Sequence, residues 1–288
     1  MSISTINSEY ARIKSVIIYL PEKDIFNFEN VKYFGFKDKL NYQNLKIEIS
    51  LLIEFFKKIN IDVKILKSES QSYPNLIYCR DLFFSTPNGP LISKMSQESR
   101  VNEPEILVNY FKTNNIKMID NIEVSNCFEG ADILWLNKSN ILIGVGDRTN
   151  IKAAKDISTN LLKYNINTTI VDKIHNQTQH LLGICQFISN NQVLVRTKLA
   201  STSLLNALTK FKYNIIEIPE NDEVINKYAM NIVVIEKNTI IMPTNCPYMK
   251  QFYLNHKIKV LKELDITELG KGGGGLACCV GILERYLI

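Results

Sequence analysis

The sequence predicts a single α/β domain over residues 1–288, arranged as an α/β propeller with fivefold pseudo-symmetry around a central site. Three observations lead to this fold class. β-hairpin patterns recur about every 45 to 55 residues, which is the period of a repeated supersecondary unit. Each hairpin is followed by a helical pattern and one more strand, which makes a ββαβ unit. The hairpin turns are short and polar, and such turns join antiparallel strands.

The first unit has no complete hairpin. The apolar run Ser15–Leu20 ends before Pro21 and predicts one buried strand. Apolar residues at three- and four-residue spacing then predict a helix over 45–58, and a short apolar segment predicts a strand at 63–66. The unit is therefore a strand, a helix and a returning strand.

The other four units each contain a predicted hairpin, helix and return strand. Their hairpins alternate apolar residues around a polar turn, and we place them at 76–84 with 90–95, 132–144, 186–195 and 231–242. Their helices have an apolar face, and we place them at 103–113, 152–163, 203–211 and 248–256. The return strands are short and apolar, and we place them at 117–119, 169–171, 215–218 and near Val260.

Units that each have one sheet face and one helix face to bury close most simply into a ring. In a ring, the segments that enter and leave each hairpin converge at the axis, so residues distant in sequence can share one site. The alternative is an open α/β sheet, but its parallel strands would need long crossovers in place of the short turns.

Composition excludes several classes of partner. The net charge of +5 comes from scattered Lys and Arg, with no basic run interleaved with aromatic residues, so no nucleic-acid partner is expected. We find no signal-peptide pattern and no apolar run near the roughly 20 residues that span a bilayer, so we expect a cytoplasmic protein without a membrane partner. The six cysteines and three histidines lack metal-ligand spacing, so neither disulfides nor a structural metal is expected.

The tail Gly270–Cys279 is the most unusual stretch. Its four consecutive glycines, Gly272–Gly275, can adopt φ > 0 and bring backbone close to a ligand. We hypothesise that they shape a pocket wall and deliver Cys278 as a nucleophile, with Cys279 pointing the other way along a strand. The alternative is a flexible loop followed by buried, unreactive thiols.

Four further segments combine carboxylate, arginine and histidine side chains at the start or end of a predicted unit. These segments are Tyr73–Asp81, Phe128–Asp132, Gly144–Asn150 and Gln179–Gly183. The ring places each of them near the axis. A purely structural interpretation is open for each segment. Asp81 would neutralise Arg80, and Glu129 would form a helix-start or turn pair with Asp132. Arg148 would be a solvated turn residue or cap carbonyls, and His180 would be a satisfied core histidine.

Together with the glycine-rich tail, these segments resemble the pentein superfamily of guanidine-modifying enzymes, which contains arginine deiminases, arginine dihydrolases, dimethylarginine hydrolases and amidinotransferases. The resemblance extends from about Pro74 to the C-terminus. It implies a cysteine nucleophile, a histidine general acid and base, two carboxylates for the guanidinium, and a group of residues for the α-carboxylate of arginine. In that order they match Cys278, His180, Glu129 with Asp81, and Asn75 with Arg148 and Arg100. Glu129 is also expected to orient the imidazole, and neither metal nor cofactor is implied.

Guanidinium chemistry agrees with this set of residue types. A guanidinium is planar, permanently charged and has five N–H donors, so a site that binds it needs carboxylates in the donor plane. The bound cation also favours the thiolate, which is the attacking form of cysteine.

Three features depart from the deiminase pattern. Leu182 stands where deiminases have an aspartate two residues after the catalytic histidine, and Ala277 stands where many relatives have a histidine. The chain also has no room for the helical insertion of deiminases. The compact size and the run that begins at Arg80 resemble the dihydrolase branch and its unassigned relatives more closely. His175 and His256 keep the interpretation of satisfied core histidines.

We therefore expect a metal-free and cofactor-free hydrolase that acts on arginine or a close guanidino compound. One hydrolysis gives citrulline, and a second gives ornithine, ammonia and carbon dioxide. An amidinotransferase that uses the same covalent intermediate is the first alternative. A non-catalytic propeller that serves as a binding module is the second, and a homo-oligomer is left open.

Overall fold

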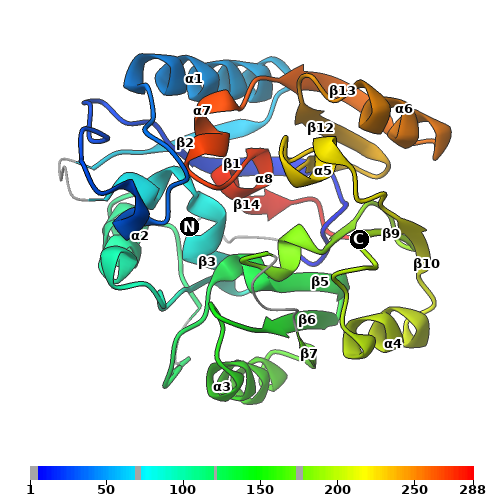
Figure 1. Cartoon of the computed structure of the whole chain (residues 1–288). Helices are drawn as coiled ribbons and strands as arrows, with labels where there is room; N and C mark the ends of the chain where they lie inside the picture. The colour runs from blue at the N-terminus through cyan, green and yellow to red at the C-terminus, as the bar shows by residue number, and fades with distance from the viewer. Residues whose placement is uncertain (1–5, 69–72, 120–121, 173–177) are drawn as a thin grey trace.

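Five small β-sheets, one for each predicted unit, form the framework of the computed structural model, which describes residues 6–68, 73–119, 122–172 and 178–288. Figure 1 shows the longer helices at the outside of the molecule and helix α8 near its middle. The longer helices are α1 (Tyr42–Lys58), α2 (Glu103–Thr113), α3 (Ile151–Leu162), α4 (Thr202–Lys210) and α6 (Pro247–Asn255). The short helices are α5 (Asp222–Ile225), α7 (Thr267–Lys271) and α8 (Leu276–Cys279).

The two ends of the chain meet in one sheet. Strand β1 (Ile13–Tyr19) pairs in parallel with β2 (Asp62–Leu66) and antiparallel with β14 (Gly281–Arg285). The first unit, which lacks a hairpin in sequence, thus obtains its antiparallel neighbour from the last strand. This pairing places the glycine-rich tail, which immediately precedes β14, beside the start of the chain.

Three sheets have the predicted order of an antiparallel hairpin followed by a parallel return strand. Their strands are β5 (Ile133–Asn137), β6 (Asn140–Val145) and β7 (Asn167–Asp172); β8 (Cys185–Phe187), β9 (Gln192–Val195) and β10 (Asn214–Glu217); and β11 (Val233–Glu236), β12 (Thr239–Pro243) and β13 (Lys259–Leu264).

The second unit differs from its prediction in two places. Within the described residues, its sheet has the two strands β3 (Phe83–Thr86) and β4 (Gly89–Ile92). Residues 117–119 are not assigned to a strand, although Ile119 N–H donates to the Pro90 carbonyl at 3.2 Å. The first part of the predicted strand 76–84 forms two 3₁₀ helices, Pro74–Ile77 and Cys79–Leu82. A short buried apolar run does not distinguish strand from helix, and Pro74 starts the first turn.

Each of the five predicted helices is present, and each packs an apolar face on a sheet. Helix α1 buries Leu45, Ile49, Leu52 and Phe56, which lie three or four residues apart. Side-chain caps fix several helix starts: the Asn41 side chain accepts from Asn44 N–H before α1. These packed helices make a rigid frame around the segments that converge on the middle of the molecule.

Candidate active site

One cavity of about 230 Å³ collects six of the seven predicted site residues. These six are Asn75, Asp81, Arg100, Arg148, His180 and Cys278. The seventh, Glu129, is fully buried and contacts His180. The predicted convergence of distant segments is therefore present in the structure, whichever role each residue takes.

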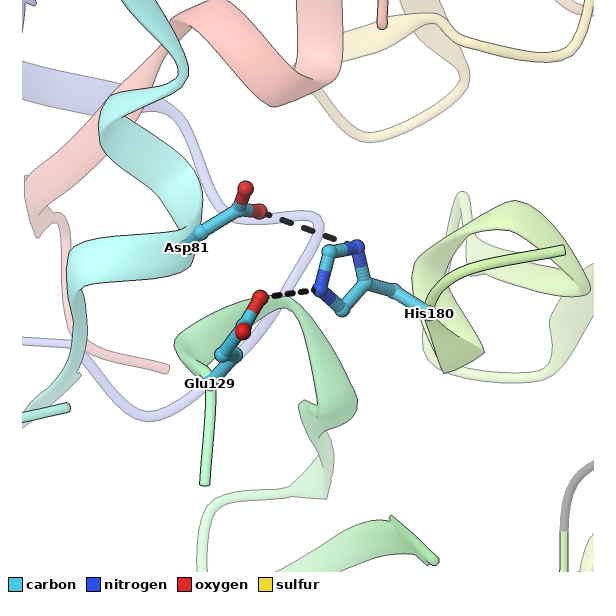
Figure 2. Close-up of side chains that lie close together, drawn as sticks. All are labelled: Asp81, Glu129 and His180. Atoms are coloured by element: carbon cyan, nitrogen blue, oxygen red, sulfur yellow. Dashed lines mark hydrogen bonds and ion pairs between the residues drawn. The ribbon is translucent and has the colours of Figure 1, made fainter. Parts of the chain in front are cut away.

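Two carboxylates face the imidazole of His180 (Figure 2). Nε2 of His180 lies 2.7 Å from Oε2 of Glu129, and Nδ1 lies 3.8 Å from Oδ1 of Asp81. The three side chains come from three sequence segments and are all buried. The imidazole is thus held between two acidic groups, which favours its cationic form.

A third acidic residue, Asp132, fixes the backbone around His180 and Glu129. Its Oδ1 accepts from Leu181 N–H at 2.8 Å, and its Oδ2 accepts from the Thr149 hydroxyl at 2.7 Å. The Thr149 hydroxyl in turn accepts from Glu129 N–H at 3.2 Å. A glycine is required directly after Glu129 because a Cβ at Gly130 would overlap the Phe83 carbonyl. Asp132 therefore acts on the site by holding the backbone next to His180.

The charges of this cluster follow from burial and proximity. Burial favours a neutral imidazole, but Asp81 and Glu129 outweigh it and raise the pKa of His180. Burial likewise disfavours the Glu129 carboxylate, yet its hydrogen bond to His180 and the nearby Arg100 lower its pKa. The pair is therefore an imidazolium beside a carboxylate, and His180 carries a proton that it can donate.

Arg100 lines the cavity, but the protein already engages its guanidinium. Nη1 lies 2.8 Å from Oδ2 of Asp81, Nε lies 2.8 Å from Oε2 of Glu103, and Nη2 donates to the Asn75 carbonyl at 3.4 Å. The geometry thus gives Arg100 the task of holding Asp81, which differs from the expected contact with a substrate carboxylate. Arg80, the alternative partner of Asp81, lies against Glu9 at 3.4 Å.

Arg148 and Asn75 lie at the cavity with groups directed to it. Nη2 of Arg148 donates to Oε1 of Gln179 at 3.4 Å, and Nη1 lies 3.7 Å from Oε1 of Glu129 without a hydrogen bond within the described residues. The Asn75 amide donates to the Phe34 carbonyl at 2.9 Å. Oδ1 of Asp81 has no hydrogen-bond partner within the described residues either. A buried donor and a buried acceptor at one cavity are suited to a ligand with both charges.

Cys278 is on a helix, which corrects the predicted strand. The Leu276–Cys279 segment forms α8, so successive side chains are rotated by about 100° rather than alternating between two faces. Cys278 is partly exposed at the cavity, and Cys279 is buried in the core, so the two thiols still face different surroundings. Burial, and after it the charge of Asp81, raises the pKa of Cys278 to about 11. The free protein therefore holds a thiol at neutral pH.

The glycine run follows the ring of Tyr78. The Tyr78 hydroxyl donates to the Leu269 carbonyl at 2.7 Å and accepts from Gly274 N–H at 3.2 Å. A Cβ at Gly272 would overlap that hydroxyl, and one at Gly274 would lie 2.5 Å from a ring carbon. Gly273 has φ of +91°. The glycines therefore form a close-packed wall of the cavity, as hypothesised, and not a loose loop.

Two residues near Cys278, Asn231 and Tyr78, were not predicted as site residues from the sequence motifs. Asn231 donates from Nδ2 to Sγ of Cys278 at 3.1 Å. Tyr78, described above, packs on the tail. Asn231 stands at the start of the last predicted hairpin, where the ring model expects site residues, and that position was the available signal. Tyr78 lies inside a segment already singled out, but only the three-dimensional contact reveals its part.

His256, the other histidine within the described residues, lies away from the described site. His175 lies outside the described residues. His256 is exposed at the end of α6, where its Nδ1 lies 2.8 Å from the Phe252 carbonyl. The expectation of a core position was therefore wrong for His256, because the apolar run before it forms the end of a surface helix.

Ligand atoms of Asp81, Glu129 and His180 lie within 4.8 Å of one another, a spacing that a metal ion could bridge. However, Arg100 already places a permanent positive charge 2.8 Å from Asp81, and His180 carries a second one. A metal ion would therefore have to compete with Arg100 for Asp81 and with a proton for His180. A planar guanidinium, with its dispersed charge and its N–H donors, fits this donor set better.

An α/β framework of five small sheets, with a cysteine, a histidine and two acidic residues gathered at one cavity, defines a guanidino-group-modifying enzyme of the pentein superfamily. Within this superfamily, residues 25–284 match the family described as N,N dimethylarginine dimethylhydrolase, eukaryotic, and the chain belongs to that family. Within the described residues, no helix has both the length and the apolar character needed to cross a bilayer.

The chain is also similar to two known bacterial proteins along most of its length. The chain is 26% identical over 283 residues to an uncharacterised protein, YkgA, of Bacillus subtilis, covering 96% of this chain and 94% of that protein. It is 23% identical over 265 residues to the N(G),N(G)-dimethylarginine dimethylaminohydrolase of Pseudomonas aeruginosa, covering 92% of this chain and 97% of that protein.

The fold is similar to a Pseudomonas aeruginosa dimethylarginine dimethylaminohydrolase in complex with citrulline, with a TM-score of 0.76 and 21% identity. The match covers 96% of this chain and 100% of that one. The fold is also similar to the amidinotransferase SxtG of Microseira wollei, with a TM-score of 0.80, 12% identity, and coverage of 100% and 98%. At these identities, the likeness supports the fold.

Proposed function

We propose that this chain hydrolyses a C–N bond of a guanidinium group through a covalent intermediate on Cys278. The observation that carries the proposal is the placement of Cys278, His180 and Asp81 at one cavity, with Glu129 bonded to His180. In this proposal, the guanidinium lies against Asp81 and Glu129, and Asn75 with Arg148 hold the carboxylate end of the substrate.

The first half-reaction releases an amine. The bound cation lowers the pKa of the Cys278 thiol, which releases its proton to solvent. The resulting thiolate attacks the guanidinium carbon. As the C–N bond breaks, the departing nitrogen takes a proton from His180 and leaves as ammonia or an alkylamine. An S-alkylthiouronium remains on Cys278.

The second half-reaction uses water. Neutral His180 removes one proton from a water molecule that attacks the thiouronium carbon and forms a tetrahedral intermediate. The C–S bond then breaks to regenerate the thiolate, and the remaining hydroxyl proton passes to solvent as the C=O bond forms. The product carries a ureido group. It is citrulline when the substrate is arginine, or when the substrate is an arginine methylated on one terminal nitrogen only and that nitrogen leaves. A second round on citrulline would give ornithine, ammonia and carbon dioxide.

Leu182 favours an N-methylated arginine among the candidate substrates. It lines the cavity, and it stands where deiminases have a carboxylate. An apolar side chain leaves an unsubstituted N–H without an acceptor, at a cost, but it contacts an N-methyl group favourably. The name of the matched family points in the same direction.

The test is to incubate the protein with arginine, with monomethylarginine and with both dimethylarginines, and to identify products by mass spectrometry. We expect citrulline with methylamine from monomethylarginine, citrulline with dimethylamine from the asymmetric dimethylarginine, N-methylcitrulline with methylamine from any symmetric dimethylarginine that reacts, and slower release of ammonia from arginine. Cys278→Ser should abolish turnover, and a variant that retained the wild-type rate would reject the proposal. Leu182→Asp should shift preference towards arginine by about tenfold, whereas the isosteric but neutral Leu182→Asn should shift it less.

Amidino transfer is the second candidate, because the amidinotransferase fold is so similar to this one. An amine acceptor would then replace water in the second half-reaction. Incubation with arginine and glycine or lysine distinguishes the two reactions: a new guanidino compound without stoichiometric ammonia would favour transfer.

We also infer that residues 1–288 form one domain and that its five sheets are the blades of a fivefold propeller. The separation into five sheets supports this arrangement, as does the cavity lined by segments from several of them. An experimental structure in which the sheets do not surround a common axis would reject it.

A further inference from the structure

Helix α8, which carries Cys278, begins without a side-chain cap of its own. The residue before it is Gly275, which has no side chain to accept the first N–H groups of the helix. Asn231, which precedes β11, supplies the acceptor instead. Its Oδ1 accepts from Ala277 N–H at 2.7 Å and from Cys278 N–H at 3.3 Å.

Gly275 makes this contact possible. A Cβ at that position would lie 2.9 to 3.0 Å from the side chain of Asn231, which is closer than ordinary van der Waals contact. The last glycine of the run therefore allows a side chain from another unit to reach the start of α8. Backbone also holds Asn231, because its own N–H donates to the Tyr228 carbonyl at 2.7 Å.

The same amide reaches the sulfur. With Oδ1 engaged by two N–H groups, the amide can present only its Nδ2 donor on the other side, and this donor lies 3.1 Å from Sγ of Cys278. A hydrogen bond to an ionised acceptor is stronger than one to a neutral acceptor. The contact therefore stabilises the thiolate more than the thiol.

We propose that Asn231 is a positioning residue for the nucleophile: it caps α8 through Oδ1 and orients and stabilises the Cys278 thiolate through Nδ2. This inference rests on the proposed function for the role of Cys278 as the nucleophile. The two contacts require different side-chain atoms. The N–H groups at the start of α8 need a hydrogen-bond acceptor, whereas the thiolate needs a hydrogen-bond donor.

Two substitutions separate these requirements. Asn231→Asp keeps the shape and the acceptor, and a carboxylate is a good cap near a helix N-terminus, but it replaces the donor with a negative charge. Asn231→Ala removes both contacts. We expect the melting temperature to fall in Asn231→Ala and to stay near wild type in Asn231→Asp.

The reactivity of Cys278 should follow the opposite order. At pH 8, iodoacetamide should alkylate Cys278 about tenfold more slowly in Asn231→Ala, because loss of the hydrogen bond raises the pKa of the thiol by about 1 to 2. Asn231→Asp should be at least as slow, because its charge opposes ionisation further. Peptide mass spectrometry separates Cys278 from the partly exposed Cys127.

Asn109→Asp is the matched control, because it adds the same charge at an exposed position on α2 and should leave both readouts unchanged. Asn231→Asp protein that alkylates at the wild-type rate would show that Asn231 is only a helix cap, and would overturn the inference. The assay needs no substrate. Failure of the proposed function, seen as turnover by Cys278→Ser, is therefore distinguishable from failure of this inference.

Discussion

The imidazole of His180 and the carboxylate of Glu129 form a buried ion pair, with Nε2 and Oε2 2.7 Å apart. Asp81 faces the other ring nitrogen at 3.8 Å. Because burial alone would favour the neutral ring, the two acidic groups decide the outcome and raise the pKa of His180. The two carboxylates therefore favour the protonated form of His180 in the free protein.

Glu129→Gln should lower the pKa of His180 by at least about one, because the variant keeps the shape and removes the charge. Native His180 binds its proton more tightly than an unfolded histidine, whose pKa is about 6.5. Its contribution to stability is thus complete below about pH 6.5 and is lost as the pH rises through the native value.

Nuclear magnetic resonance titration of the imidazole measures this shift directly. Thermal unfolding of the wild type and of Glu129→Gln from pH 6 to 9 provides the second readout, since the wild type should lose more stability over that range. Glu123→Gln, which removes the charge of a different acidic residue, should leave the titration of His180 unchanged. An unaltered titration in Glu129→Gln would reject the ion pair as the source of the raised pKa.

Cys278 should be nearly inert to alkylation at neutral pH until a cation is bound. Its pKa of about 11, raised by burial and by Asp81, leaves little thiolate at pH 7. A small guanidinium ion that leaves the sulfur accessible should compensate the carboxylates and speed alkylation several-fold. For substrates, kcat/KM should have a bell-shaped pH profile, limited by ionisation of the thiol and by loss of the His180 proton.

Sodium chloride at matched ionic strength is the control for the guanidinium effect, because it supplies charge without the planar N–H donors. Rapid alkylation at pH 6 in the absence of ligand would show a preformed thiolate–imidazolium pair. That result would reject activation by substrate while leaving Cys278 as the nucleophile.

Arg100→Met should destabilise the fold strongly. The substitution leaves Asp81 and Glu103 buried without the guanidinium that bonds both, and breaking a buried pair in this way costs about 3 to 5 kcal/mol. Urea unfolding measures the loss. Adding Glu103→Gln should recover part of it, because one of the two stranded carboxylates is removed.

The exposed pair of Arg12 and Glu236 offers a matched control. Arg12→Met should cost less than about 1 kcal/mol, since solvent screens such a pair. Equal losses from Arg100→Met and Arg12→Met would mean that Arg100 does not hold Asp81 in the way that the geometry indicates.

Much of the framework was accessible from sequence because periodicity is a local property. Alternating and helical patterns located the hairpins at 132–144 and 231–242 and the helices behind them, and the motifs located the residues that meet at the cavity. The ββαβ order could be predicted because each unit repeats the same pattern.

What escaped prediction depends on contacts between distant segments. The pairing of β1 with β14 is set by closure of the whole chain, and no local pattern encodes it. The short helix that carries Cys278 is capped by Asn231, 47 residues earlier, so its own sequence gives little helical signal. Arg100 matched a motif position, but only the three-dimensional arrangement shows that Asp81 and Glu103 already bind it.

The glycine run also depends on a contact with a distant segment, because Tyr78 leaves no room for a side chain at Gly272 or Gly274. A double-mutant cycle can test this dependence. A Cβ at Gly272 would overlap the Tyr78 hydroxyl, whereas one at Gly274 would meet the ring carbons of the same residue. Gly272→Ala and Gly274→Ala should each cost about 1 to 3 kcal/mol, as overpacking does.

Tyr78→Phe should then rescue one variant and not the other. Removing the hydroxyl relieves the overlap at Gly272, so Gly272→Ala should cost about 1 kcal/mol less when it is combined with Tyr78→Phe, while the cost of Gly274→Ala stays the same because the ring remains. Urea unfolding of the single and double variants measures both couplings, with Tyr78→Phe alone correcting for the hydroxyl's lost hydrogen bonds to the Leu269 carbonyl and from Gly274 N–H. If Gly272→Ala costs the same in both backgrounds, Tyr78 is not the reason for that glycine.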